Sequence, residues 1–439
     1  MKQNWVKRRW IFVFFFFGFM FVHQFDIYFL SPSAAQFFWN GNAINIFQNP
    51  MNGPVILVSL IFFLIWGYNF DRHSRKKLLA GAAFLWWITR WLMSFSPTLG
   101  TFLISYAASG VDHASYSGIF ALVGDYFEPK NRSKVFGFFF LAHPLVFLAG
   151  LFLTYSNQFE FTWRTWLLVV GAVGLICSIF IALKIHDPKR GHSEPALAKI
   201  AMMGVYQFDW EVAKVELRKP ALLTLFALSL FSMIPWTVLT NWLYPYFRDS
   251  LGMPSSRIYL ALLPGLFGVV LGYPLGGALG DFLFTHRRRG RVIVSLFGNL
   301  MASVCLCVAF LNLESATTAF IISIALMGLF LGFLLPNLAT SLMDVTLPEL
   351  RGTAYGIMLL LQSAGILLTP LFVNLLQNYL PLDQVILWIC VGAWLIGAVL
   401  HIALFKYLPD GIEDLRRHLA YRGLLEARIA TLNYRRMEG

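Results

Sequence analysis

Ionisable side chains inside long apolar runs are the residues of this sequence that could do chemistry. His23 and Asp26 stand three positions apart in one run, Arg90 stands in another, and Asp112 and His113 are neighbours in a third. Residues three apart share a helix face, and ionisable groups are costly in lipid, so they are functional candidates by default. Carboxylates, an arginine and histidines can take up and relay protons. The set therefore predicts a proton-coupling and substrate-binding site.

Two further residues complete the predicted site, Tyr116 and His143. In the expected mechanism, a proton releases a carboxyl–arginine pair and biases one conformation over another. Arg90 either pairs with the carboxylates or binds substrate. The alternative is a static buried ion pair that holds helices together. For His143 the alternative is a hydrogen bond to a carbonyl freed by the kink at Pro144.

Two charged patterns occur twice, about half a chain apart. The first pattern is Asp125, Pro129, Arg132 and Gly137, repeated with the same spacing as Asp344, Pro348, Arg351 and Gly356. The second pattern is Gly67 and Asp71 with Arg72, Arg75, Lys76 and Lys77, repeated as Gly277 and Asp281 with Arg287, Arg288, Arg289 and Arg291. A membrane chain with such an internal repeat is typical of a transporter whose two halves rock about a central site.

The repeated residues predict an inner latch between the halves. Glycine allows close helix packing, and an aspartate suits the positive N-terminus of a helix from the opposite half. The latch candidates are Gly67, Asp71, Arg72, Arg75, Lys76, Asp125, Arg132, Gly277, Asp281, Asp344 and Arg351. The alternative is anchoring of the topology by positive loops, which needs charge but no fixed Asp, Pro or Gly.

Apolar helices must position these residues. The 439 residues are 58% hydrophobic and 13% charged, with mean hydropathy +0.66, whereas soluble domains carry about 25% charged residues. Runs of about 20 apolar residues can cross a bilayer as helices. The expected spans are 10–30, 54–70, 78–96, 99–123, 134–156, 164–184, 220–246, 258–280, 292–312, 316–342, 353–379 and 384–406. Within them, Pro235, Pro264, Pro336 and Pro370 are possible bend points.

The predicted fold is therefore an all-α polytopic membrane protein, with twelve transmembrane helices in two pseudo-symmetric six-helix bundles. The predicted parts are an N-terminal bundle (1–184), a cytoplasmic linker (185–219), a C-terminal bundle (220–408) and a basic amphipathic tail (409–439). The linker should contain a short helix within 208–219 on the inner face. The simpler interpretation is that the linker is a solvated or interfacial connection between the halves. The tail should rest on headgroups. The second half has no Asp, Glu, Lys or Arg deep in a span, so proton handling is assigned to the first half.

The distribution of charge predicts orientation. Of the 34 Lys and Arg, all but a few fall in segments that lie on one side if the N-terminus is cytoplasmic. By the positive-inside rule, both termini are expected in the cytoplasm of a plasma (inner) membrane, and the +12 net charge faces anionic lipid. Trp86, Trp87 and Trp91 are expected in an interfacial belt. The expected partners are a small-molecule or lipid substrate, a proton and membrane lipids, with no nucleic acid, and the protein is expected to be a monomer.

Enzymatic and cofactor functions are not expected. The sequence contains no nucleophile–base constellation, metal cluster or phosphate loop, so neither a cofactor nor a metal is predicted. The four cysteines fall inside apolar spans without disulfide or metal spacing, which indicates packing. They are Cys177, Cys305, Cys307 and Cys390.

The motifs resemble those of the major facilitator superfamily, and more closely its Spinster-like branch. The superfamily resemblance rests on the Gly67 to Lys77 loop and its copy at Gly277, and covers nearly the whole chain. The Spinster-like resemblance rests on the run Ala-Ser-Tyr-Ser at 114–117 and on Asp26, in a segment where that branch has Asn-Tyr-Met-Asp-Arg-Tyr. It implies a proton-coupled or facilitative carrier of lysophospholipids and sphingoid lipids.

The chain departs from this branch where coupling would occur. The arginine that follows the branch's aspartate is replaced by Ile27, and the branch's glutamate aligns with His113, beside the added Asp112. Arg90 is the candidate that replaces the missing cation. The resemblance therefore implies a coupling role for Asp26 alone.

Three functions remain open from the sequence. The first is a secondary carrier of an amphipathic lipid, in which Tyr116, Trp236 and Tyr244 are aromatic candidates for substrate contact. The second is a carrier of a small polar solute or organic anion, such as a sugar, carboxylate or drug, bound by Arg90. The third is a non-transporting membrane sensor or scaffold, against which the intact motifs in both halves weigh.

Overall fold

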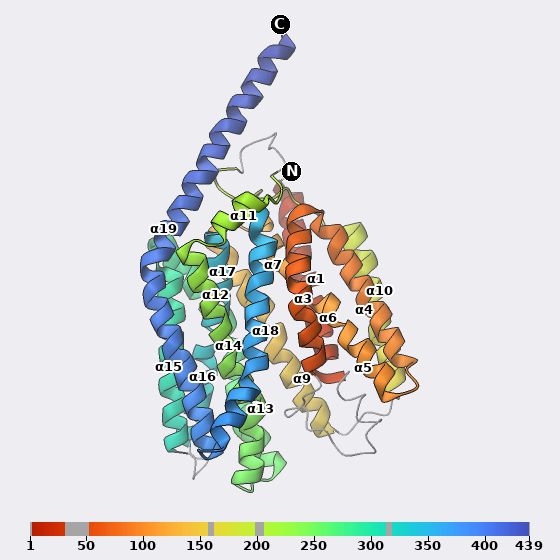
Figure 1. Cartoon of the computed structure of the whole chain (residues 1–439), viewed down its shortest axis with the longest axis vertical. Coiled ribbons are helices and arrows are strands. Elements are labelled where there is room, and N and C mark those ends of the chain that lie inside the picture. Colours follow the sequence, from red (N-terminus) through yellow and green to blue (C-terminus); the bar gives the residue numbers. More distant parts are fainter. Residues whose placement is uncertain (1, 31–51, 157–161, 198–205, 313–317, 439) are drawn as a thin grey trace.

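The computed structural model describes residues 2–30, 52–156, 162–197, 206–312 and 318–438, and every regular element in these ranges is a helix (Figure 1). The expected all-α class is confirmed. Parts of the predicted segments lie outside the described residues: residues 1, 31–51 and 157–161 of the N-terminal bundle, residues 198–205 of the linker, residues 313–317 of the C-terminal bundle, which include the start of span 316–342, and residue 439 of the tail.

The helices of the first half follow the predicted spans. They are α1 (Lys2–Phe25), η1 (Asp26–Leu30), α3 (Asn52–Arg72), α4 (Arg75–Ser94), α5 (Leu99–Ala108), α6 (Gly110–His113), α7 (Tyr116–Tyr126), η4 (Pro129–Asn131), α8 (Arg132–Phe140), α9 (Ala142–Ser156) and α10 (Trp163–Lys184). Element η1 is a π-helical turn that continues α1. The site residue Asp26 is the first residue of this irregular turn.

The linker and the second half contain the remaining helices. They are α11 (Trp210–Glu216), α12 (Pro220–Ser232), α13 (Ile234–Pro245), η5 (Tyr246–Ser250), α14 (Ser255–His286), α15 (Gly290–Leu311), α16 (Thr318–Leu331), α17 (Leu334–Asp344), η7 (Pro348–Leu350), α18 (Arg351–Gln377) and α19 (Leu382–Glu438). Helix α11 confirms the short helix predicted in the linker.

Ten helical segments among the described residues are long and apolar enough to cross a membrane. The two other predicted spans are also helical. Span 78–96 lies in α4, which begins with three basic residues and contains Arg90. Span 99–123 is divided into α5, α6 and α7, with interruptions at Ser109 and at Ala114 and Ser115. The basic residues of α4 and the interruptions between α5, α6 and α7 explain why these two segments are not among the ten.

Two of the four predicted bend points coincide with breaks. The helix breaks at Met233, just before Pro235, and between α16 and α17, just before Pro336. Proline cannot donate to the preceding turn, which favours a break at this place. Helices α14 and α18 continue through Pro264 and Pro370.

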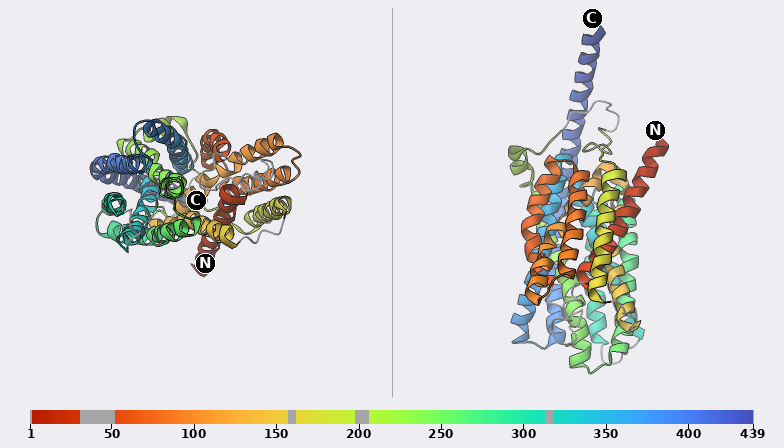
Figure 2. Two further views of the ribbon diagram at one scale, coloured as in Figure 1. Left: turned by 90° about the horizontal axis from the view of Figure 1, so that it is seen from below. Right: turned by 90° about the vertical axis from the view of Figure 1, so that its right-hand side faces the viewer.

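The two halves meet along a few helix pairs. Helix α18 of the second half packs along α3 of the first, and α14 packs along α8, while α4 packs on α10 and α16 on α14 within the halves. Both termini lie at the same end of the bundle (Figures 1 and 2). We call this the inner end, following the orientation expected from the basic residues.

The tail differs from the expected separate surface helix. Helix α19 continues through Pro409 without a break and leaves the bundle along the direction of the spanning helices (Figure 1). Its apolar residues Leu415 and Leu419 are buried against Leu197 and Ala213 of the linker and Leu350 of the second half. Protein contacts thus cover the first part of the apolar face that the sequence assigned to headgroups, whereas Leu425 and Ile429 further along the helix are exposed.

Candidate functional site

Asp26 and Arg90 form a buried ion pair at the centre of the first half. Both side chains are fully buried, and Arg90 Nε donates to Asp26 Oδ2. The same oxygen accepts from Trp86 Nε1 at 2.8 Å. Arg90 Nη1 also lies 2.9 Å from Met93 Sδ. The structure thus brings together the aspartate and the arginine that the sequence singled out, and Arg90 pairs with Asp26 rather than with Asp112.

His23 and Asp112 form a second buried pair. His23 Nε2 lies 2.6 Å from Asp112 Oδ2, and the other ring nitrogen, Nδ1, lies 2.8 Å from the hydroxyl of Tyr116. The His23 ring also packs edge-on against Trp86, with ring centroids 4.9 Å apart. Since Trp86 binds Asp26, this single indole contacts both pairs. The two pairs therefore form one polar cluster on α1, α4, α6 and α7.

His113 stands beside this cluster with hydrogen-bonding capacity unused. Its ring stacks on that of His23, with centroids 5.8 Å apart. Among the described residues, His113 Nδ1, Asp112 Oδ1 and Arg90 Nη2 are buried without a hydrogen-bond partner. Unused buried donors and acceptors are costly, and ones gathered around two ion pairs indicate a site where a proton, a water or a substrate group binds.

His143 contacts the cluster and the second half. Its Nδ1 lies 3.2 Å from Gln24 Oε1, so the expected bond to a carbonyl freed at Pro144 is not what the structure shows. Its ring packs against Trp236 of α13, with centroids 5.2 Å apart. Tyr244, another aromatic candidate, instead donates to Ser255 Oγ at 3.0 Å. Among the predicted cavity residues, His143 and Trp236 therefore meet between the halves.

The repeated aspartates cap helices of the opposite half. Asp71 accepts from the backbone N–H groups of Gly352 and Thr353 at 2.8 and 2.6 Å, at the N-terminus of α18. Asp281 accepts from Ser133 N and Lys134 N at 3.2 and 2.9 Å, at the N-terminus of α8. A carboxylate stabilises the positive end of a helix. These contacts join the two halves at the inner end.

One arginine extends each cap, and the two arginines do so in the same way. Arg75 pairs with Asp71 at 3.1 Å and with Asp125, and donates to the carbonyl of Pro348. Arg291 pairs with Asp281 at 2.7 Å and with Asp344, and it donates to the carbonyl of Pro129 in the same manner. Each arginine thus joins two carboxylates of its own half to the repeated proline of the other.

The repeated glycines allow the halves to touch. A Cβ on Gly67 would stand 2.8 Å from Gly352 O, and one on Gly277 would stand 2.3 Å from Ser133 O. Gly137 and Gly356 meet backbone oxygens of the opposite half in the same way, both at 2.4 Å. Any larger residue at these four positions would separate the helices that cross there.

Two predicted latch residues do not bridge the halves. Arg72 is exposed and stacks on Tyr68 of its own helix, and the contact recorded for Lys76 is a backbone bond to Asp187. Neither side chain lies at the contact between the halves, and the Arg72 side chain is exposed at the inner end. The sequence set omitted Arg291 because it stands ten positions after Asp281, whereas Arg75 follows Asp71 by four.

Sequence reasoning also missed Trp86 and Glu194. Trp86 was assigned to the interfacial belt, but it is fully buried and holds Asp26. Glu194 of the linker is 4% exposed and accepts from Arg132 and Arg351. Burial raises the pKa of Glu194, but these two arginines outweigh it and lower the pKa to about 2. A carboxylate within a basic linker was the only available signal.

No group of three or more His, Cys, Asp or Glu that could hold a metal occurs in the part of the chain that the structure describes. The buried cysteines Cys177 and Cys390 are free thiols, as are the half-buried Cys305 and Cys307. The chemistry available at the site is therefore that of carboxylates, histidines, a guanidinium and aromatic donors.

Curated relatives agree with the resemblance to Spinster proteins. The chain is 29% identical over 320 residues to Protein spinster of Drosophila melanogaster, which covers 68% of this chain and 50% of that protein. It is 33% identical over 135 residues to the sphingosine-1-phosphate transporter SPNS2 of Xenopus tropicalis, which covers 30% of this chain and 26% of that protein. The chain thus spans about half the length of the Drosophila relative.

Solved transporters share the fold. The structure of the proton:xylose symporter XylE aligns with a TM-score of 0.70 at 12% identity, covering 93% of this chain and 97% of that one. The Xenopus relative and the xylose symporter are both transport proteins. The model of the Major Facilitator Superfamily matches residues 12–289 and 266–421, so the chain belongs to this superfamily.

Proposed function

We propose that this protein is a secondary carrier that works by alternating access and moves a lysophospholipid-like amphipathic lipid together with a proton. The observation that carries the proposal is the polar cluster of the first half, in which two buried acid–base pairs, Asp26–Arg90 and His23–Asp112, share the indole of Trp86. Removing one charge of a buried pair leaves the partner charge uncompensated, so a proton that binds at either pair would change the contacts of the cluster.

Protonation of either carboxylate would weaken its contact with its partner in the cluster. A proton on Asp112 Oδ2 weakens the charge-assisted bond to His23 Nε2, and a proton on Asp26 releases Arg90. His113, stacked on His23 with an unpartnered Nδ1, is placed to pass the proton on. The released Arg90 then attracts a substrate anion, such as a lipid phosphate, and so couples proton and substrate.

The inner latch would supply the two conformations. With Asp71 and Asp281 on the helices of the opposite half, the inner end is closed. Opening it requires both caps to separate, and a ligand or proton can drive this only through different affinities for the two conformations. The matching caps in both halves support a symmetric rocking motion and weigh against a static scaffold.

The relatives and the aromatic contacts support a lipid. The Xenopus relative is a transporter of sphingosine-1-phosphate, which is a lipid with a charged head and a long hydrocarbon tail. Where the halves meet, Trp236 packs against His143 and Phe147, with centroids 5.2 and 5.6 Å apart. This combination of apolar rings with a nearby polar cluster suits an amphipathic molecule. We place the carrier in a plasma membrane as a monomer, with both termini cytoplasmic.

The test of the substrate is uptake into proteoliposomes. Labelled lysophospholipid and a labelled organic anion of similar charge are offered with and without a proton gradient. Gradient-dependent movement of the lipid and not of the anion supports the proposal. Movement of the anion alone would overturn the lipid assignment and favour the small-solute carrier, in which a substrate displaces Asp26 from Arg90.

A further inference from the structure

The linker between the halves is docked into the inner latch. Gly191 N donates to Asp125 Oδ1 at 2.8 Å, and Ser193 Oγ donates to the carbonyls of Gly124 and Phe127 at 2.5 and 2.8 Å. Gly191 adopts a positive φ of 74°, which glycine tolerates without strain. The segment around Ser193 is therefore fixed to the inner end of α7, and it is not a solvated connection.

Glu194 lies at the centre of this docked segment, between the two repeated arginines. One oxygen, Oε1, accepts from Arg132 Nη2 at 2.5 Å and from Arg351 Nη2. Arg132 belongs to the first half and Arg351 to the second, and their exposed fractions are 1% and 0%. A single carboxylate of the linker thus bonds to equivalent residues of both halves.

The arginines depend on this carboxylate. The Nη1 atoms of Arg132 and Arg351 stand 3.8 and 3.9 Å from the repeated aspartates Asp344 and Asp125, beyond hydrogen-bond distance. Arg351 Nε and Nη1 have no hydrogen-bond partner among the described residues. Two buried guanidinium groups that face each other across the halves repel, and Glu194, together with the more distant Asp344 and Asp125, offsets this repulsion.

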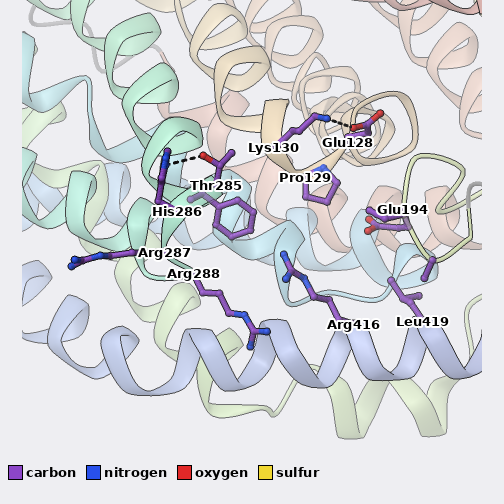
Figure 3. A pocket seen from close by; sticks show the side chains of 13 residues that line it. Glu128, Pro129, Lys130, Glu194, Thr285, His286, Arg287, Arg288, Arg416 and Leu419 are labelled. Carbon is purple, nitrogen blue, oxygen red and sulfur yellow. Dashed lines mark hydrogen bonds and ion pairs between the residues drawn. The ribbon is translucent and has the colours of Figure 1, made fainter.

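A cavity of about 690 Å³ lies beside Glu194 (Figure 3). It is bounded by the loop at Pro129, the inner end of α14 and the tail helix, from which Arg416 projects toward the cavity. Glu194 and Pro195 line it on one side. The linker therefore has space into which it can withdraw, and cations such as Arg416 can receive the carboxylate there.

We propose that the linker is the third part of the inner latch. Glu194 is a positioning residue that holds Arg132 and Arg351 together while the inner end is closed, and it releases at least one of them when the halves separate. The inference rests on the alternating access proposed above, but it concerns the linker and is independent of the substrate.

The test measures opening of the inner end without substrate. Ala354 of α18 is fully buried near Arg351, so a cysteine placed there by Ala354→Cys reacts with an impermeant thiol reagent only when the inner end opens. The full-length chain carries this change alone or with Glu194→Gln, Glu194→Asp or Glu128→Gln, and peptide mass spectrometry separates the labelling of position 354 from that of the four native cysteines. Glu128 lines the same cavity but pairs with Lys130 in an exposed position, which makes it the matched control.

Glu194→Gln should raise the labelling rate about tenfold, because hydrogen bonds to charged groups contribute about 1.5–3 kcal/mol. Glu194→Asp, which keeps the charge, should restore much of the protection, and Glu128→Gln should leave the rate unchanged. A general loss of folding would show in gel filtration and would not be rescued by aspartate. A labelling rate in Glu194→Gln within twofold of the parent would overturn the inference. Failure of lipid uptake with a raised labelling rate would contradict the proposed substrate and leave the linker's role standing.

Discussion

Asp71 and Gly352 are 281 residues apart in the sequence, yet the carboxylate of the first accepts a hydrogen bond from the backbone of the second at 2.8 Å. Asp281 makes the equivalent contacts with Ser133 and Lys134 in the other half. The inner end is therefore closed by the same device used twice, and each copy can be tested separately.

Removing one cap should weaken the closed inner end. Asp71→Ala leaves the N-terminus of α18 uncapped and leaves Arg75 buried with Asp125 alone. Breaking a buried ion pair costs about 3–5 kcal/mol, so we expect a lower melting temperature and a raised labelling rate of Ala354→Cys. Thermal unfolding in detergent and thiol labelling measure the two effects. Arg72→Ala, an exposed change in the same loop, should alter neither; equal effects of the two variants would refute the cap.

Glycine packing makes a steric prediction. Gly277→Ala places a Cβ 2.3 Å from Ser133 O, so the backbone of α14 and α8 must separate. Forcing a methyl group into such a contact costs about 1–3 kcal/mol, and the inner end should open more readily. Gly392→Ala is the control, because a Cβ there meets no heavy atom within 4 Å. The labelling assay compares them, and an unchanged rate in Gly277→Ala would count against the tight crossing.

Much of this inner end could be predicted from the sequence because local patterns determine it. The spacing of Asp, Pro, Arg and Gly is repeated, and helix N-termini attract carboxylates. Arg291 and Glu194 escaped prediction because their partners are set by how loops return in space. Nothing in the local sequence says that Glu194 stands between Arg132 and Arg351.

The polar cluster, too, could be predicted only in part from the sequence. Asp26 and Arg90 were singled out because charge inside an apolar span is expensive. Trp86, one turn before Arg90, carries no charge, so the sequence placed it with Trp87 and Trp91 at the interface. The structure puts its indole on Asp26 and against His23. An aromatic residue that acts through its N–H has no signature that separates it from one that faces lipid.

Trp86 should tune coupling while its neighbour does not. Trp86→Phe removes the N–H donor to Asp26 Oδ2 and keeps most of the ring. Because a hydrogen bond that holds the carboxylate beside Arg90 is lost, the rate of gradient-driven lipid uptake should fall. Trp87→Phe is the matched control, since Trp87 Nε1 has no hydrogen-bond partner among the described residues. The measurement is the rate of gradient-driven lipid uptake; equal rates for the two variants would exclude this role.

The contribution of Glu194 to the stability of the latch should not depend on pH in the neutral range. Its pKa is lowered from 4.5 to about 2, so its stabilising contribution is complete above 4.5 and is lost as pH falls through about 2. The difference in melting temperature between the parent and Glu194→Gln should therefore be constant from about pH 5 to 8. This difference in melting temperature should become smaller below pH 4.5. A difference that varies between pH 5 and 8 would mean that the carboxylate is not held between two arginines in the folded protein.

The central claim is that the buried cluster couples lipid movement to a proton. The measurement is simultaneous proton flux and lysophospholipid uptake in proteoliposomes, for the parent and for Asp26→Asn, with Asp209→Asn of the exposed linker helix cap as control. We predict that the parent and the control move both together, and that Asp26→Asn loses proton flux and gradient-driven uptake while remaining folded. Full gradient-driven uptake in Asp26→Asn would contradict the account.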